Sequence, residues 1–417
     1  MRGGFLGVAV ATAVAAVFTL LLNAAVFRGS TTEAQQAAFT VFWYGALIVS
    51  FGVFLPLEQV VSRAASEGRL RGATVVRPAL VLLVVAVGGV LLASPLLGND
   101  AGTRTWVVVA LVTLSGISAL QYAARGLALG RGRMGPYAAA LAADAVLRGL
   151  AATLVTVLVF QPPAWLFAVF VLASALLAHV GLLLVLRRQS AGVTAASIAG
   201  PVAGGAAGTP MTRAALTLLG ASVAGQLLLN AGPIAVGLEP GKEAVIAAYG
   251  AAFTLARAPL FVVVPAQAVL VPPLTRMVAE GRLHELRVRM AQFSAAVVLV
   301  AAVGAGVGGL LARPAMDLFT KGQLQVPPGL MALMVGGCLV HAGLVVGTQA
   351  LVATGKERAV LTCWIAGLVV AAAWIAVAQL GFGVTASWGV AGGFTAGSAA
   401  AWLLSVLVLV QRPHPRP

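Results

Sequence analysis

Apolar runs of about 18 residues or more recur along the whole chain, and they limit the folds open to it more than any other feature. A run of this length, folded as a helix, crosses a hydrocarbon layer of about 30 Å. Only 9% of the residues are charged, whereas soluble domains carry about 25%. The sequence therefore predicts an all-α polytopic membrane protein.

Polar or glycine-rich turns divide the apolar runs into twelve predicted transmembrane helices. They cover residues 5–27, 38–61, 77–97, 105–124, 136–159, 164–186, 212–237, 244–271, 291–312, 328–352, 359–381 and 386–410. The first run lies where a signal peptide would lie, but only Arg2 precedes it and it exceeds the usual apolar core of about 7–15 residues. We expect it to be retained as the first span.

The basic residues alternate between the two sides of these spans. One side carries 19: Arg2, Arg63, Arg69, Arg71, Arg77, Arg125, Arg131, Arg133, Arg187, Arg188, Arg213, Arg276, Arg282, Arg287, Arg289, Lys356, Arg358, Arg412 and Arg416. The other side carries 5: Arg28, Arg104, Lys242, Arg313 and Lys321. Cytoplasmic loops are rich in Lys and Arg, so both termini are predicted to be cytoplasmic in a bacterial plasma membrane. The net charge of +15 thus reflects orientation, and no nucleic-acid partner is expected.

One uncharged stretch rich in Gly, Ala, Ser and Pro divides the spans six and six. It predicts a cytoplasmic linker at 189–211, between an N-terminal lobe at 1–188 and a C-terminal lobe at 212–417. Three short phrases repeat in the same order in both halves. Leu21–Ala24 matches Leu228–Ala231, SRAASEGRL (62–70) matches TRMVAEGRL (275–283), and the basic loop 130–133 matches 355–358. Six crossings separate each pair, which predicts a parallel repeat about an axis along the membrane normal.

The repeated phrase SRAASEGRL/TRMVAEGRL carries arginines where a helix enters the cytoplasm. They are Arg63, Arg69, Arg276 and Arg282. Two interpretations stand: the arginines contact lipid headgroups and fix orientation, or they form a cytoplasmic gate that recruits a lipid pyrophosphate.

Two other features carry no predicted chemistry. Residues 130–135 match G-x-G-x-x-G, but their flanks are apolar helices and not the strand and helix of a dinucleotide-binding unit. Cys338 and Cys363 lie within apolar spans and suit small buried hydrophobes. No cofactor and no metal are expected.

A charged pair lies near the middle of the fifth predicted span. Asp144 and Arg148 are four residues apart, so they share one helix face in the favourable acid-first order. Charges at this depth are costly and usually functional or paired. Both a structural ion pair and an ion- or proton-coupling role remain open.

The other intramembrane polar residues are single. Arg257 in the eighth span has no counter-charge nearby on its own helix, and Glu58 in the second is the one other acid within a span. We expect both to face a central cavity, as intramembrane ionisable residues often do. Asn23, Asn230 and Gln226 either line this cavity or join helices. His341 either relays protons or bonds to a neighbouring helix, and Pro56, Pro259 and Pro265 are expected to distort their helices.

The segment around the eighth span resembles the MOP flippase superfamily. The shared pattern is a Tyr early in the helix, a mid-helix Pro, then P-x-L-[ST]-R and a polar loop ending in Gly. It is matched here by Tyr249, Pro259, Pro272 or Pro273, Leu274, Thr275, Arg276 and Gly281. FLPLEQVVSRAASEG is similar to actinobacterial polysaccharide-biosynthesis members of the superfamily. The resemblance implies two six-helix lobes forming a V around a central cavity.

The resemblance also implies a function, namely an alternating-access flippase for a polyisoprenyl-linked oligosaccharide. Lipid II flippases of the superfamily carry cavity arginines on spans 1, 2 and 8, and only Arg257 matches. Implied partners are the lipid-linked oligosaccharide, membrane lipids, and glycosyltransferases or a polymerase of the same pathway.

The alternative is a cation-coupled exporter of small drugs or metabolites, although span 1 lacks the acidic site of MATE exporters. A non-transporting scaffold for cell-wall assembly is a further hypothesis. A membrane glycosyltransferase is disfavoured because the outer-loop acids Asp100, Glu239, Glu243 and Asp317 form no paired motif, so no enzyme is expected.

Overall fold

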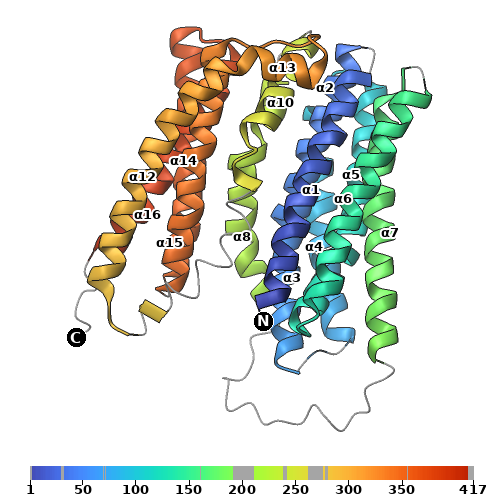
Figure 1. Cartoon of the computed structure of the whole chain (residues 1–417), viewed down its shortest axis with the longest axis vertical. Coiled ribbons are helices and arrows are strands. Elements are labelled where there is room, and N and C mark those ends of the chain that lie inside the picture. Colours follow the sequence, from blue (N-terminus) through green and yellow to red (C-terminus); the bar gives the residue numbers. More distant parts are fainter. Residues whose placement is uncertain are drawn as a thin grey trace. The chain divides into compact units, whose positions relative to one another are not determined.

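The computed structural model describes residues 2–29, 32–68, 70, 72–159, 161–190, 211–237, 242–261, 276–277, 280–354 and 356–411 (Figure 1). Every regular element in these residues is a helix. Eleven of the helices are long and apolar enough to cross a membrane. The prediction of an all-α, multi-pass membrane protein is therefore confirmed. The chain divides into two compact units, Met1–Gln226 and Leu227–Pro417, each described here by itself.

Unit 1 contains seven long helical segments. They are α1 (Arg2–Gly29), the continuous run of α2 (Glu33–Leu47), π-helix η1 (Ile48–Phe54) and α3 (Leu55–Ser66), then α4 (Gly72–Ala93), α5 (Ala101–Gly130), α6 (Met134–Leu158), α7 (Ala164–Ser190) and α8 (Met211–Asn230). The short 3₁₀ helix η2 (Ser94–Leu96) joins α4 to α5. α1 packs along α6, α3 packs on α5, and α7 packs on both α5 and α6. The unit boundary falls within α8, whose last residues belong to unit 2.

The predicted distortion at Pro56 takes the form of the π-helix η1. Proline has no backbone N–H, and its ring collides with the carbonyl four residues earlier, so a wider turn relieves the helix. The opened backbone gains one side-chain partner, and a side chain of η1 bonds to α5. Ser222 of α8 donates a hydrogen bond to the carbonyl of Phe51 at 2.8 Å, and Ser50 bonds to Ser118 of α5 at 3.0 Å. These bonds tie α5 and the first part of α8 to η1.

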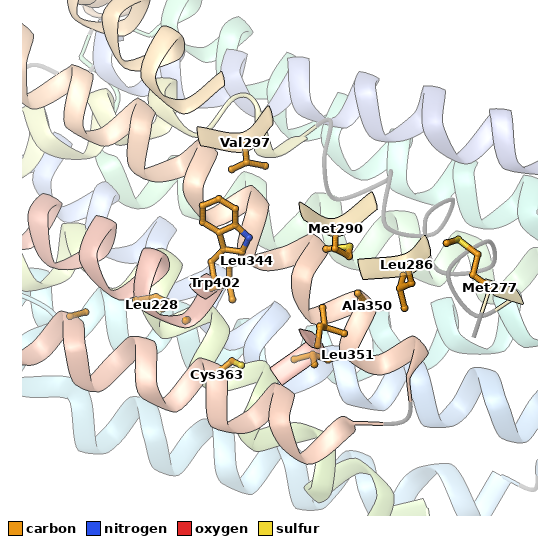
Figure 2. Packing of buried hydrophobic residues seen from close by; sticks show 13 residues of the cluster. Leu228, Met277, Leu286, Met290, Val297, Leu344, Ala350, Leu351, Cys363 and Trp402 are labelled. Atoms are coloured by element: carbon orange, nitrogen blue, oxygen red, sulfur yellow. The ribbon is translucent and has the colours of Figure 1, made fainter. Parts of the chain in front are cut away.

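Unit 2 is built on four long, adjacent helices. They are α12 (Leu283–Leu310), α14 (Pro328–Ala353), α15 (Glu357–Ala376) and α16 (Ala386–Val410), and Figure 1 shows them running side by side. The shorter elements are α9 (Gly232–Val236), α10 (Glu243–Ala256), α13 (Ala312–Thr320) and the π-helix η4 (Val377–Gly381). α14 and α15 both pack on α16, and α12 packs on α14. Figure 2 shows the apolar core of this unit, in which Trp402 lies close to Val297 and Leu344.

Two predicted spans are wrong in detail. The seventh ends as a continuous helix at Asn230, and the short helix α9 follows, with Pro233 in its first turn. The eighth was predicted as one helix over 244–271, but α10 ends at Ala256 and the chain then turns. Pro259 explains this end, because proline disfavours helical continuation. Residues 262–275, which include Pro265 and the P-x-L-[ST]-R match, lie outside the described residues, as does linker segment 191–210. The lobe boundaries therefore stay a prediction.

The repeated phrase SRAASEGRL/TRMVAEGRL encodes a helix-ending turn. Gly68 and Gly281, its shared glycines, have φ of 66° and 72°, a backbone region that L side chains rarely adopt. At the first copy, the N–H of Glu67 bonds to the carbonyl of Arg63, and at the second the N–H of Glu280 bonds to that of Arg276. Left-handed glycines commonly end helices in this way. The glycine is thus required by the turn.

Candidate functional site

A buried ion pair joins α3 and α5 in unit 1. Nε of Arg125 lies 2.9 Å from a carboxylate oxygen of Glu58, and both side chains are 8% exposed. Arg125 also donates to the hydroxyl of Tyr137 at 3.0 Å, and that hydroxyl donates to Glu58 at 3.4 Å. The guanidinium carbon lies 4.8 Å from the centre of the Tyr122 ring, a favourable cation–π distance. Glu58 is thus neutralised inside unit 1, while its predicted role in a substrate cavity stays a prediction.

Arg125 corrects the sequence analysis, which placed it in a cytoplasmic loop. The predicted span ended at residue 124, whereas α5 continues to Gly130 and carries Arg125 as a buried helical residue. The sequence signal for a buried cation was Glu58, because a buried carboxylate requires a cation or hydrogen-bond donors nearby. The sequence alone did not say which arginine supplied the charge.

The predicted pair Asp144–Arg148 is present and is part of a larger network. Nη1 of Arg148 lies 3.0 Å from a carboxylate oxygen of Asp144. The hydroxyl of Ser174 on α7 donates to the other oxygen at 2.8 Å, and Arg148 also donates to the hydroxyl of Thr19 on α1 at 3.1 Å. Thr19 in turn accepts a bond through its carbonyl from the side-chain amide of Asn23 at 2.9 Å. Three predicted residues, Asn23, Asp144 and Arg148, therefore share one network across α1 and α6.

Arg257 and Asn230 come together in unit 2. Nη1 of Arg257 donates to the side-chain oxygen of Asn230 at 3.1 Å, and both residues are buried, at 6% and 1% exposed. Arg257 follows the last residue of α10, and Asn230 is the last residue of α8. The C-terminal ends of helices carry partial negative charge, which favours a guanidinium there. The guanidinium also lies 5.7 Å from the centre of the Phe261 ring.

His341 bonds to a neighbouring helix, one of its two predicted interpretations. Its Nδ1 lies 3.0 Å from the hydroxyl of Ser398 on α16. Its ring contacts Phe394 and Trp364, with centroid distances of 5.5 and 5.6 Å. These contacts are those of a packed core histidine, and a proton-relay role stays a prediction.

The remaining predicted residues lie at other places. Gln226 is on α8 and packs close to Gly52 of η1. A Cβ atom added at Gly52 would lie 3.4 Å from the Cβ atom of Gln226. Arg63 and Arg276 are exposed, and Arg69 lies outside the described residues. Arg282 is exposed and pairs with Glu280 and Glu285. The hydrogen bonds that Arg282 donates to these two carboxylates raise its pKa above the ordinary value.

The arrangement has no features of a metal centre. Within the described residues, no three His, Cys, Asp or Glu side chains come together as metal ligands. The polar groups instead form cation–carboxylate and cation–amide pairs within an apolar, membrane-spanning body. Such groups are suited to bind an anion or to transfer a proton.

Comparison with known proteins identifies the fold and not the substrate. No protein-family model matches the chain, and no curated protein matches it. A multidrug resistance MATE family transporter of the MOP superfamily in its inward-facing conformation is similar over 96% of this chain and 97% of its own, with a TM-score of 0.72 and 15% identity. The chain has the MATE fold.

Two further structures agree with this fold. An outward-facing multidrug resistance MATE transporter gives a TM-score of 0.66 at 14% identity, over 97% of this chain and 94% of its own. A MOP superfamily transporter from Pyrococcus furiosus, described as having a binding pocket of reverse polarity that suggests a different function, gives 0.60 at 13% identity, again over 97% and 94%. At such identities the likeness concerns the fold alone, and function has to be argued from the residues.

Proposed function

We propose that the chain is an alternating-access flippase that moves a polyisoprenyl-linked oligosaccharide across the plasma membrane for cell-wall or surface polysaccharide assembly. The MATE fold supports transport, because the proteins that share it are described as transporters in inward- and outward-facing conformations. The observation that carries the choice of substrate is the guanidinium of Arg257, buried beside Asn230 within unit 2.

Arg257 and Asn230 together suit a pyrophosphate-linked sugar. A guanidinium offers a planar fork of donors that matches phosphate oxygens, and it keeps its charge when buried. The side-chain oxygen of Asn230 accepts a hydrogen bond from Nη1 of Arg257 at 3.1 Å. The amide of Asn230 is also a second polar group suited to sugar hydroxyls. Gln226, four residues earlier on α8, and Asn23 are the further proposed sugar contacts. The apolar body around them suits the hydrocarbon part of a lipid carrier.

Complementation tests this proposal. In a strain that lacks the gene, Arg257→Ala is expected to leave surface polysaccharide unrestored and to cause a lipid-linked intermediate to accumulate. Loss of one charge-assisted hydrogen bond, about 1.5–3 kcal/mol, corresponds to roughly a 10- to 150-fold loss of affinity. Arg257→Lys keeps the charge but not the fork, so it should restore activity only in part.

The matched control is Arg187→Ala, which removes an exposed arginine of α7 that has no proposed contact with the substrate and should restore wild-type levels. Expression and thermal unfolding of each variant in detergent separate loss of binding from loss of the fold. Full restoration by Arg257→Ala would contradict the proposed role of Arg257.

A cation-coupled exporter of small drugs or metabolites is the second candidate. The buried acid Asp144, bonded to Ser174 and Arg148, favours it because a buried carboxylate is the group that takes up a proton or cation. Resistance to cationic drugs on expression, without any effect on lipid-linked sugars, would support this candidate over the flippase.

The remaining proposals concern the surroundings of the protein. Exposed Arg63 and Arg276 are proposed to contact anionic lipid headgroups on the cytoplasmic side, with glycosyltransferases or a polymerase as partners there. Labelling of single cysteines placed at either terminus from each side of the membrane tests the proposed orientation.

A further inference from the structure

His179, on α7, is a fully buried histidine with one free ring nitrogen. The side chain is 0% exposed, and Nδ1 lies 2.7 Å from the carbonyl oxygen of Ala175. A carbonyl only accepts hydrogen bonds, so Nδ1 carries the proton and the neutral ring leaves a lone pair on Nε2. Nε2 is buried, and no partner for it lies among the residues that the structure describes.

A buried acceptor without a donor is costly and uncommon. It costs about 1–3 kcal/mol, and about nine in ten buried polar groups avoid that cost by forming a hydrogen bond. A leucine or phenylalanine would occupy the same place without this cost. His341 in unit 2 is the contrasting case, because its bond to Ser398 ties it to a neighbouring helix. His179 therefore calls for an explanation other than packing.

The charges around His179 come from both buried ion pairs of unit 1. Asp144 and Arg148 of α6 and Arg125 of α5 act on it electrostatically, and both helices pack on α7. Arg125 is bonded in turn to Glu58 and Tyr137.

The other charged groups near α7 point to solvent. The described charges of α1 and α2, Arg28 and Glu33, are exposed, as are Arg187 and Arg188 of α7 itself. His179 thus lies near Arg125, Arg148 and Asp144, and the two cations are paired with the carboxylates of Glu58 and Asp144.

We propose that His179 is the proton-binding site of unit 1. Nε2 takes up one proton from water when the transporter is open to one side of the membrane and releases it to water on the other side. The imidazolium then replaces Arg148 as the counter-charge of Asp144, which couples the protonation of α7 to the contact between α6 and α1. This inference rests on the proposed transport function, to which it adds the coupling ion.

The first test measures protonation directly and needs no substrate. Nitrogen-15 NMR of the full chain, labelled at its 4 histidines in lipid nanodiscs, reports the state of each ring nitrogen. His179→Gln identifies the signal. We expect Nε2 of His179 to become protonated as the pH falls from about 8 to about 5, the range in which imidazole changes charge.

Two variants test the role of Asp144. Asp144→Asn removes the carboxylate and should lower the midpoint by about one pH unit or more. If that variant does not fold, Ser174→Ala removes the hydrogen bond that occupies Asp144 and should raise the midpoint. His341→Gln is the control and should leave the His179 midpoint unchanged. An Nε2 that stays unprotonated throughout, or a midpoint indifferent to Asp144 and Ser174, would overturn the proposal.

The second test asks whether this proton is used in transport. In the complementation assay, His179→Gln should reduce activity tenfold or more, and His284→Gln, at an exposed histidine of α12, should leave it near wild type. Full activity of His179→Gln would overturn the coupling role while leaving the flippase proposal intact. Full activity of Arg257→Ala would contradict the substrate role and leave the histidine titration unaffected.

Discussion

The two units repeat one helical plan but differ in what they bury. The repeated basic loops set an offset of 225 residues, which brings Arg125 to Ala350 and Asp144 to Val369. In unit 1 these positions carry charges held in ion pairs. In unit 2, Ala350 is fully buried in the apolar core of Figure 2, and Val369 is 62% exposed.

The packing of the first helix differs in the same way. In unit 1, α1 lies along α6, and Gly149 allows the close approach, since a side chain there would meet the backbone oxygen of Phe18 at 2.8 Å. The same offset brings Gly149 to Trp374, whose indole lies against Gly392 of α16. Among the described residues, ion pairs thus contribute to the packing of unit 1, and unit 2 packs mainly through apolar contacts, with the buried cation Arg257 beside Asn230.

The largest expected effect comes from breaking the ion pair of unit 1. Arg125→Ala leaves the carboxylate of Glu58 buried without its cation, and the expected loss of stability is about 3–5 kcal/mol. Replacing both residues by leucine should recover most of this loss, because apolar pairs often match buried ion pairs. Unfolding in detergent measures both variants, with exposed Arg63→Ala as the control. If the double leucine variant is as unstable as Arg125→Ala, apolar side chains cannot replace the buried ion pair in unit 1.

The contact of α1 with α6 is the next target. Gly149→Leu forces a side chain against the backbone of Phe18 and should cost about 1–3 kcal/mol or more. Gly116→Leu, on α5, is the matched control, because nothing lies within 4 Å of a side chain added there. Equal thermal stability of the two variants would contradict the close packing of α1 on α6.

A smaller difference is expected between two serines that hold titratable side chains. Ser174→Ala removes a hydrogen bond to the charged Asp144, and the expected loss is about 1.5–3 kcal/mol. Ser398→Ala removes a bond to neutral His341 and should cost about 1 kcal/mol. Unfolding in one detergent compares them directly. A larger loss of stability for Ser398→Ala than for Ser174→Ala would contradict the proposal that polar contacts contribute more to unit 1 than to unit 2.

The smallest expected effect concerns how equivalent helices begin. Asp100 caps α5 by accepting a hydrogen bond from the N–H of Thr103 at 2.8 Å. Hydrogen bonding to the side chain of Thr103, followed by hydrogen bonding to its backbone, lowers the pKa of Asp100 below its ordinary value. A lowered pKa means that the cap stabilises the helix at neutral pH and that this contribution is lost as the pH falls below about 4. α14, its counterpart in unit 2, begins at Pro328 without a side-chain cap.

Hydrogen exchange of the first turn of each helix tests this difference. Exchange at the start of α5 should rise in acid, whereas that of α14 should change little. Asp100→Asn keeps a capping residue and should remove the pH dependence, at a total effect of about 1 kcal/mol or less. An acid response that persists in Asp100→Asn would assign it to another group.

Much of the fold could be predicted because membrane helices are encoded locally. Apolar length defines most of the spans, and the order of Asp144 and Arg148 on one helix face predicts their contact without knowledge of any other helix. The repeat was also readable, since Gly68 and Gly281 mark the same helix-ending turn. The eighth span was mispredicted because hydropathy does not detect a helix end at Ala256 when the following residues remain apolar.

The sequence by itself determined the class of the protein, its membrane-spanning character and the internal repeat, because these depend on composition and on contacts within a few residues. The tertiary structure alone decided which charges meet. Glu58 and Arg125 are far apart in the chain, as are Asn230 and Arg257, and only helix packing brings each pair within hydrogen-bond distance. The free nitrogen of His179 likewise appears only once its neighbours are known, since a lone apolar-helix histidine in a sequence does not show which of its two nitrogens is bonded.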